Sequence, residues 1–195
     1  MGSVEMNSRK KIGLFGGSFD PVHHGHLILA RDAMEQLGLE RIVFIPANIS
    51  PHKLGLPPAP ANLSRDMLAA AIEGEPGFEI DTCEIDREGV SFAVDTVRSM
   101  IQRHPEADFS YFIGEDNVAA LHTWKEIDEL RSLVEFVVLS RGDSTPGCPF
   151  PVVSRRIDIS STDIRKRIAA GLSVRYLLPE KTCEIIERHG LYRNE

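Results

Sequence analysis

Two histidines and two glycines in the short stretch Gly16–His26 are the residues of this chain best suited to chemistry. His23 and His26 are three positions apart, so their rings would share one face of a helix that begins near His23. Gly16 and Gly17 would let the backbone approach an anion with no side chain in the way. Because several hydrogen-bond donors would converge here, the pattern favours a polyphosphate over a single carboxylate.

The flanking elements would hold this stretch between the end of a strand and the start of a helix. Residues 11–15 predict a short buried strand, and residues 24–37 predict a helix that Gly38 ends. The first turn of a helix carries unpaired N–H groups and about half a positive charge. A glycine-rich turn at this place is therefore expected to bind an anion.

The stretch differs from the two commonest phosphate-binding motifs. A Walker A loop needs a lysine after its glycines, and the dinucleotide fingerprint needs Gly-x-Gly-x-x-Gly, whereas the spacing here is Gly13-x-x-Gly16-Gly17. The stretch resembles the phosphate loop and His-x-Gly-His motif of the nucleotidyltransferase superfamily related to class I tRNA synthetases. With Gly-Gly-Ser-Phe-Asp-Pro in front, it resembles the family of bacterial nicotinate mononucleotide adenylyltransferases.

Two other interpretations of the histidines remain open from the residues alone. The three histidines and Asp20 could form a metal site, although no cysteine is near and the spacing is unusual for zinc. The histidines could also cap the helix and stay in solvent. The nucleotide interpretation is favoured because a second motif supports it.

That second motif is another strand-to-helix junction, at residues 159–165. Ser160 suits a helix N-cap and has capping-box spacing to Asp163, and Gly171 would end the helix. Arg165 is unexpected, because a cation in the first turn opposes the helix dipole by a few tenths to about 1 kcal/mol. An anion held there would explain it, since arginine can bind one bidentately; otherwise residues 165–167 form an exposed charged face.

Residues 160–165 resemble the Ser-Ser-Thr-x-x-Arg motif that binds ATP phosphates in the same superfamily. The two motifs occur in the expected order, and the resemblance covers residues 11–193. It implies an α/β fold with a doubly wound, mainly parallel sheet: a Rossmann-like nucleotidyltransferase fold in a single domain. It also implies adenylyl transfer from Mg-ATP to nicotinate mononucleotide, giving nicotinate adenine dinucleotide and pyrophosphate, without a covalent enzyme intermediate.

The resemblance also implies roles for residues of the two motifs. The catalytic residues would be His23, His26 and Arg165, with His26 near the α-phosphate. Ser161, Thr162 and Arg165 would hold the β- and γ-phosphates, and magnesium would arrive with ATP rather than in a dedicated protein site. The full ATP-binding set would be Gly16, Gly17, Ser18, Phe19, His23, His26, Ser161, Thr162 and Arg165.

The same resemblance suggests where the mononucleotide would bind. Lys53, in a Pro-His-Lys segment, would reach its phosphate, Asp116 would contact a ribose or a water, and Trp124 would stack on the pyridine ring. A lone tryptophan can equally be a core residue. The remaining members would be Ser91, Phe92 and Ala93.

Two departures from the family pattern affect these expectations. Ser18 stands where threonine is commoner, which keeps the hydroxyl. Phe92 and Ala93 stand where the family has tyrosine and threonine, and in the family that threonine helps bind the nicotinate carboxylate. With Ala93 only backbone N–H groups remain, so the selection of acid over amide is left open.

The rest of the chain predicts the elements that would carry these sites. Strands are expected at 41–45, 78–81, 83–85, 109–113, 135–139, 152–153 and 156–159, and helices at 65–72, 91–103, 121–133, 162–170 and 179–188. The runs 42–45 and 136–139 are apolar without alternation, as in parallel strands covered on both faces. The proline-rich segment 46–61 would be a substrate loop or a mobile surface loop.

Composition limits the classes of function. The net charge of −7 disfavours a broad nucleic-acid surface, and no apolar run is long enough to span a membrane. The three cysteines are far apart without a Cys-x-x-Cys pair, which favours a reduced, cytoplasmic protein. We expect a disordered leader at 1–10 and one domain at 11–195, with the oligomeric state open.

Two other functions remain open from the sequence. One is transfer to another phosphate-bearing acceptor, such as nicotinamide mononucleotide or phosphopantetheine. The other is a non-catalytic module that binds a nucleotide as a sensor.

Overall fold

The computed structural model describes residues 9–48, 59–87, 89–142 and 147–193. Its centre is a six-stranded sheet in the order β3-β2-β1-β4-β5-β6, with every pair of neighbouring strands parallel. This confirms the predicted doubly wound, parallel α/β fold. The strands are β1 Lys10–Gly17, β2 Arg41–Pro46, β3 Phe78–Ile80, β4 Ala107–Gly114, β5 Glu135–Ser140 and β6 Val152–Ser154.

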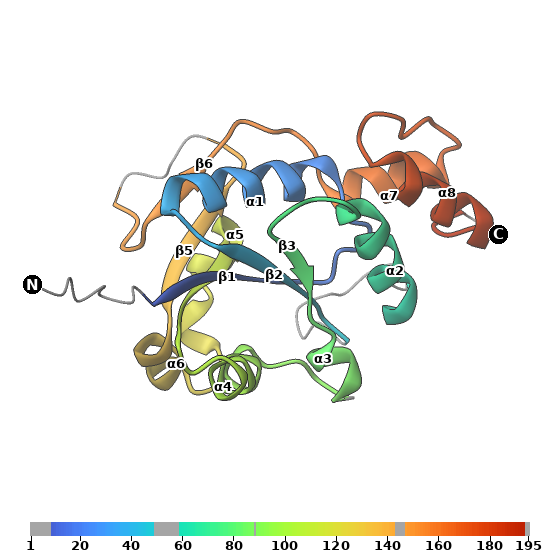
Figure 1. The fold of residues 1–195 in the computed structure, drawn as a ribbon. Coiled ribbons are helices and arrows are strands. Elements are labelled where there is room, and N and C mark those ends of the chain that lie inside the picture. The colour runs from blue at the N-terminus through green and yellow to red at the C-terminus, as the bar shows by residue number, and fades with distance from the viewer. Residues whose placement is uncertain (1–8, 49–58, 88, 143–146, 194–195) are drawn as a thin grey trace, which may run out of the picture.

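Helices cover both faces of this sheet (Figure 1). Helix α1 lies on one face and α4 and α6 lie on the other, while α2, α7 and α8 gather at one end of the molecule. Short pieces, α3, α5 and the 3-10 turn η1, connect the layers. The bounds are α1 His24–Leu37, α2 Ala61–Ile72, α3 Cys83–Asp86, α4 Ala93–Arg103, α5 Glu115–Val118, η1 Leu121–Thr123, α6 Ile127–Leu133, α7 Ser161–Ala169 and α8 Glu180–His189.

The central strands are apolar on both faces because each face has its own buried cluster. In β2, Ile42 and Phe44 belong to the cluster under α1, whereas Val43 and Ile45 belong to the cluster under α4 and α6. Strand β5 divides in the same way. Successive side chains of a strand point to opposite faces, so a strand buried on both sides shows no polar alternation.

The chain reverses its winding direction between β1 and β4, which are neighbours in the sheet. The connection from β1 runs through α1 towards one edge, and the connection from β4 runs towards the other edge. Ligands of such sheets bind outside the carboxyl ends of the strands at this reversal. The residues at that point are Gly16 and Gly17 at the end of β1 and Gly114 at the end of β4.

Three of the expected elements are wrong in detail. Residues 83–85 begin α3 instead of a strand, because the Asp81 carboxylate accepts a hydrogen bond from the Cys83 backbone at 2.9 Å and turns the chain. Residues 156–159 are not a strand, although Ile157 N–H still bonds to the Arg141 carbonyl at 3.1 Å. The expected helix 121–133 is interrupted, because the backbone of Trp124 is extended and Glu126 has a left-handed φ of 50°.

At the N-terminus, β1 starts at Lys10, one residue before the expected domain boundary. Arg9 is also fixed, because its guanidinium bonds to the carbonyl oxygens of Pro105 and Ala107 and pairs with Asp108. Residues 1–8 lie outside the described residues.

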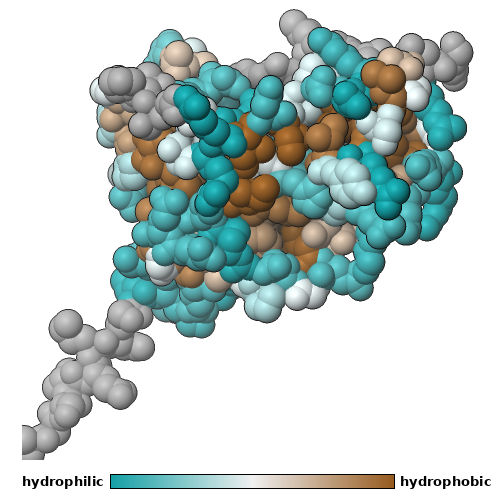
Figure 2. All heavy atoms as spheres, turned by 90° about the horizontal axis from the view of Figure 1, so that it is seen from above, coloured by the Kyte–Doolittle hydropathy of each residue, from teal (hydrophilic) through white to brown (hydrophobic). Residues whose placement is uncertain are grey.

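The surface seen from above is mainly hydrophilic, with smaller hydrophobic areas between the polar residues (Figure 2). Among the exposed apolar side chains are Ile28 on α1, Leu172 and Tyr176. In the part of the chain that the structure describes, no helix has the length and apolar character to cross a bilayer.

Candidate active site

The turn after β1 is held in place by aromatic packing. Phe19 has a left-handed φ of 43°, which is costly for a bulky residue, and its ring is buried against Phe15 and Phe44 at centroid distances of 5.4 and 5.7 Å. The packing stabilises a backbone shape that the residue would not adopt alone. The turn is therefore preformed.

Gly16 lines the cleft at the end of β1, and its role in binding ATP stays a prediction. A Cβ atom at this position would lie 2.8 Å from the Tyr111 hydroxyl oxygen, well inside contact distance. The space beside Gly16 is thus filled by Tyr111 from β4, and the glycine allows the two strands to bring their ends together.

The two histidines lie side by side at the start of α1, as predicted. Their rings are stacked with centroids 3.7 Å apart and an interplanar angle of 21°. His23 is the N-cap, with extended backbone, and His26 lies in the first turn. Gly25 makes room for this pair, because a Cβ there would lie 3.0 Å from the His23 ring.

The hydrogen bonds of the pair fix the proton positions. His26 Nδ1 accepts a hydrogen bond from the His23 backbone N–H at 3.2 Å, so the ring proton of neutral His26 is on Nε2, which can donate. Burial lowers the pKa of His23 to about 3, with smaller contributions from the positive charges of Arg141 and His24. His23 is therefore neutral at physiological pH. The His23 side chain also has a capping-box arrangement with the His26 backbone, although its buried Nδ1 makes no regular hydrogen bond among the described residues.

The second motif forms the start of α7, where Ser160 caps the helix by accepting from the Asp163 backbone at 3.1 Å. The Ser161 hydroxyl donates to the Pro21 carbonyl at 2.9 Å and so joins the two motifs directly. Ser161 and Thr162 line the same cleft as the glycines and the histidines, a space of about 630 Å³. The structure thus brings together two segments that are far apart in the sequence.

Arg165 is placed differently from the other members of the predicted ATP site. Its Nη1 donates to the Asp20 carbonyl at 2.6 Å and its Nη2 donates to the Thr162 hydroxyl at 3.3 Å. The side chain is 16% exposed. Among the described residues, those lining the cleft do not include Arg165, so it lies behind Thr162 in this structure.

Five of the six residues expected to bind the mononucleotide also line this cleft. They are Ser91, Phe92, Ala93, Asp116 and Trp124. The Trp124 ring packs edge-on against Tyr111 and Phe136 while also lining the cleft. The core interpretation is therefore correct in part, and stacking on the pyridine ring stays a prediction. Lys53 lies outside the described residues.

Two basic residues of the cleft were missed by the sequence analysis. Arg141 follows β5, donates to the Ile159 carbonyl at 2.9 Å and lies 3.7 Å from the Asp116 carboxylate. Lys125 lies with Nζ 4.8 Å from the centre of the Phe92 ring and donates to Asp95 at 2.9 Å. The signal for Arg141 was its place directly after the carboxyl end of an apolar strand.

A buried carboxylate, Glu84, also lines the cleft and was missed because the segment was expected to be a strand. It accepts a hydrogen bond from the Thr96 hydroxyl at 2.6 Å, and burial raises its pKa. Thr96 belongs to α4, and Ser91 also bonds to Glu84. Glu84 therefore stabilises the loop that carries Ser91–Ala93.

The cleft continues into an adjoining hollow of about 730 Å³ beside α5. The two spaces share Gly114, Asp116, Leu139, Arg141 and Ser160. Both volumes lie in the range of small-molecule sites. Over the described ranges, no three His, Cys, Asp or Glu side chains are placed to hold a metal ion, so the histidines and Asp20 do not form the metal site considered above.

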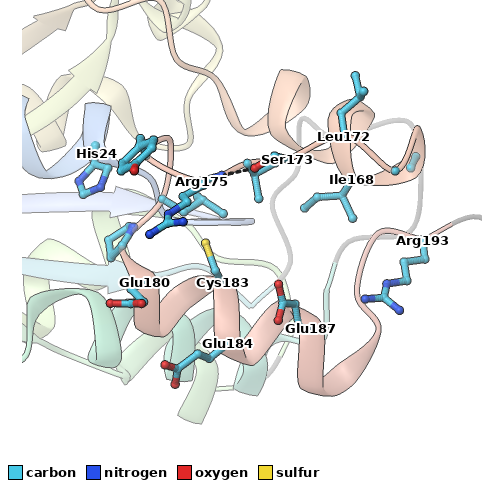
Figure 3. A pocket seen from close by; sticks show the side chains of 16 residues that line it. His24, Ile168, Leu172, Ser173, Arg175, Glu180, Cys183, Glu184, Glu187 and Arg193 are labelled. Atoms are coloured by element: carbon cyan, nitrogen blue, oxygen red, sulfur yellow. Dashed lines mark hydrogen bonds between the residues drawn. The ribbon is translucent and has the colours of Figure 1, made fainter.

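A separate hollow, of about 1010 Å³, lies between the end of α7 and α8 (Figure 3). Three carboxylates of α8, those of Glu180, Glu184 and Glu187, lie along one side of it. They would repel phosphates, and in the described structure none of the site residues predicted from the sequence lines this hollow.

Comparison with known proteins shows which families the chain resembles. The model of the Cytidylyltransferase-like family matches residues 14–167. A probable nicotinate-nucleotide adenylyltransferase of Geobacillus thermodenitrificans is 42% identical over 185 residues, covering 93% of this chain and 86% of the relative. The nicotinate-nucleotide adenylyltransferase of Bacillus subtilis is 37% identical over 188 residues, covering 95% and 100%.

Solved structures share the fold. The nicotinic acid mononucleotide adenylyltransferase of Plasmodium falciparum, complexed with NaAD, aligns with a TM-score of 0.77 at 18% identity, covering 94% of this chain and 97% of that one. The same protein complexed with APC aligns with a TM-score of 0.74.

Proposed function

Because the chain belongs to the cytidylyltransferase-like family, and within it to the nicotinate-nucleotide adenylyltransferases, we propose that it transfers the adenylyl group of ATP to nicotinate mononucleotide. The products are nicotinate adenine dinucleotide and pyrophosphate. The observation that carries this proposal is the bond from Ser161 to Pro21, which places both phosphate motifs on one cleft.

In this reaction the protein must align the two reacting phosphates and stabilise their charge. The phosphate of the mononucleotide attacks the α-phosphorus of ATP, a new P–O bond forms, and the bond from the α-phosphorus to the leaving oxygen breaks. A phosphate needs no general base to act as a nucleophile, so the barrier lies in charge repulsion and alignment. Donors fixed before the reaction lower this barrier.

We assign His26 and His23 to the reacting end of ATP. His26 donates from Nε2, and its ring is oriented by the bond that Nδ1 accepts from the His23 backbone. His23 remains neutral at physiological pH, because burial lowers its pKa to about 3. The stacked arrangement keeps both rings at the edge of the cleft.

The start of α7 would bind the leaving pyrophosphate. Ser161 and Thr162 line the cleft next to the free N–H groups of the first turn, and Arg165 lies directly behind them. Arg141 adds a second positive charge on this wall. The backbone of Gly17–Phe19 would close the other side.

Magnesium would be held by the ATP phosphates, since the described residues offer no carboxylate cage. When bound, the ion neutralises part of the triphosphate charge. The protein's contribution is to hold the magnesium–nucleotide complex through the two helix starts.

The acceptor would bind on the wall formed by Phe92, Ala93 and Trp124, with Lys53 and Asp116 reaching its phosphate and ribose. Lys125 adds a cation beside Phe92, which favours an acceptor with a carboxylate. Ala93, which lacks the family hydroxyl, favours the second candidate, transfer to nicotinamide mononucleotide.

We place this function in the cytoplasm, supported by three free cysteines.

The test is an acceptor panel with purified protein, Mg²⁺ and ATP. We expect pyrophosphate release and a dinucleotide product with nicotinate mononucleotide, a lower kcat/KM with nicotinamide mononucleotide, and no product with phosphopantetheine. If ATP binds but no acceptor gives pyrophosphate, the proposed enzyme activity is rejected, and the hypothesis of a nucleotide-binding sensor module remains.

A further inference from the structure

The carboxylate of Asp20 is the centre of a hydrogen-bond network that joins four distant parts of the chain. Asp20 is 2% exposed. Its Oδ1 accepts from the Tyr192 hydroxyl at 2.5 Å and from the Ala59 backbone N–H at 3.1 Å. Its Oδ2 lies 3.8 Å from Arg165 Nη1, which also donates to the Asp20 carbonyl.

A buried carboxylate is costly unless it is paired and hydrogen-bonded, so these partners hold Asp20 in one position. Of the two neutral donors to the Asp20 carboxylate, the Tyr192 hydroxyl makes the shorter bond, which is charge-assisted, and so contributes more to holding the carboxylate in place. Burial and the neighbouring Asp20 charge raise the pKa of Tyr192, so the hydroxyl stays protonated and donates throughout the physiological range.

Arg165 needs such a partner because of its place in the fold. It is the fifth residue of α7, and its guanidinium reaches back to Thr162 in the first turn, where the helix dipole opposes a positive charge. The Asp20 carboxylate offsets this charge, and the Asp20 carbonyl fixes the direction of the guanidinium. Any movement of Asp20 would therefore move Arg165 and, next to it, Thr162.

We propose that Tyr192 is a positioning residue for the ATP site: acting through Asp20, its hydroxyl holds Arg165 behind the phosphate-binding start of α7. The C-terminal segment after α8 thus contributes to the ATP site, although it belongs to neither of the two motifs that form that site. This inference rests on the proposed function, because it assigns the network to binding of the ATP triphosphate.

The substitution that tests it is Tyr192→Phe. Tyr192 packs against the hydrophobic cluster under α1, and phenylalanine keeps that packing while removing only the hydroxyl. We expect KM for ATP to rise about tenfold, equivalent to about 1.4 kcal/mol, with kcat, KM for nicotinate mononucleotide and Tm nearly unchanged. Calorimetric Kd for ATP should rise by the same factor, which gives a readout that needs no turnover.

The matched control is Tyr176→Phe, since Tyr176 is 80% exposed and contacts Arg175. This variant should behave as the wild type. As a second variant, Asp20→Asn removes the charge that pairs with Arg165 and should raise KM for ATP at least as much as Tyr192→Phe.

A double-mutant cycle shows whether Tyr192 acts through Arg165. In an Arg165→Ala background, Tyr192→Phe should change the Kd for ATP less than twofold. An equal effect of Tyr192→Phe in both backgrounds would overturn the proposal, as would an unchanged Kd for ATP or a fall in Tm without any change in binding. Turnover by the wild type tests the proposed function separately.

Discussion

A single hydrogen bond orients His26 for the catalytic role that we propose for it. The bond that Nδ1 accepts from the His23 backbone leaves the proton on Nε2, so the ring is a ready donor before any substrate arrives. A donor that is oriented in advance avoids the cost of reorganisation during the reaction. The stacked His23 ring and the edge-on ring of Phe19 hold it in that orientation.

We therefore expect His26→Ala to lower kcat by about a hundredfold to a thousandfold, the usual loss of a transition-state donor. Circular dichroism and Tm should show that the fold persists. The control is His24→Ala, because His24 lies next to the pair but lines the separate hollow near α8. Near-normal kcat in His26→Ala would remove this histidine from the mechanism.

Lys125 is the residue expected to compensate for the hydroxyl that Ala93 lacks. Its ammonium lies over the Phe92 ring, next to the wall assigned to the pyridine base. A cation there attracts the negative carboxylate of nicotinate, and its interaction with the uncharged amide of nicotinamide is much weaker.

Lys125→Met keeps the length of the side chain and removes the charge. The ratio of kcat/KM for nicotinate mononucleotide to that for nicotinamide mononucleotide should fall about fivefold to tenfold, as for the loss of a partly screened ion pair. Lys181→Met, on the distant α8, is the control and should leave the ratio unchanged. An unchanged ratio in Lys125→Met would assign acid selection to backbone groups.

At the scale of elements, the starts of α1 and α7 line one cleft, and each is held by contacts outside its own helix. The N-terminus of α1 is fixed by the bond from His24 N–H to the Leu177 carbonyl at 3.1 Å, and the two helix starts are joined through Ser161 and Pro21. The site is thus positioned by the C-terminal segment as well as by the sheet.

The buried start of α1 also predicts a dependence of stability on pH. The pKa of His23 is about 3 in the folded protein and 6.5 ordinarily, so between these values the unfolded chain binds more protons. His23 therefore does not lower the free energy of unfolding above about pH 6.5. Below that value it lowers the free energy of unfolding progressively as the pH drops towards 3. Thermal unfolding between pH 7 and pH 4 should show a smaller loss of Tm in His23→Gln than in the wild type. Parallel losses in both proteins would contradict the assignment.

For the whole molecule, the sequence predicted those features whose pattern lies within a few neighbouring residues. Unbroken apolar runs such as 136–139 predicted the central strands, and Gly16–His26 predicted the turn and the helix start. The prediction failed at 83–85, where side chains decide the fold: Asp81 turns the chain and Glu84 bonds to Thr96. Alternating polarity alone could not reveal these bonds.

The network around Asp20 could not be predicted, because its contacts join residues that are distant in the sequence. Arg165 and Tyr192 lie 145 and 172 residues after Asp20 in the sequence and meet it only in the folded structure. For Arg141 the sequence offered one signal, its position directly after β5, but its place in the cleft depends on how β5 lies beside β4. Motifs indicate which residues bind phosphate, and packing determines what holds them there.

The central claim is that two helix starts bind one triphosphate in one cleft. Hydrogen exchange measured during titration with a non-hydrolysable ATP analogue tests it most directly, because the amides of 16–26 and 160–165 are followed separately in one experiment. We predict that both segments become protected with the same midpoint, while the amides of α8 beside the separate hollow stay unchanged. Protection of one segment alone, or of the α8 hollow instead, would contradict the account.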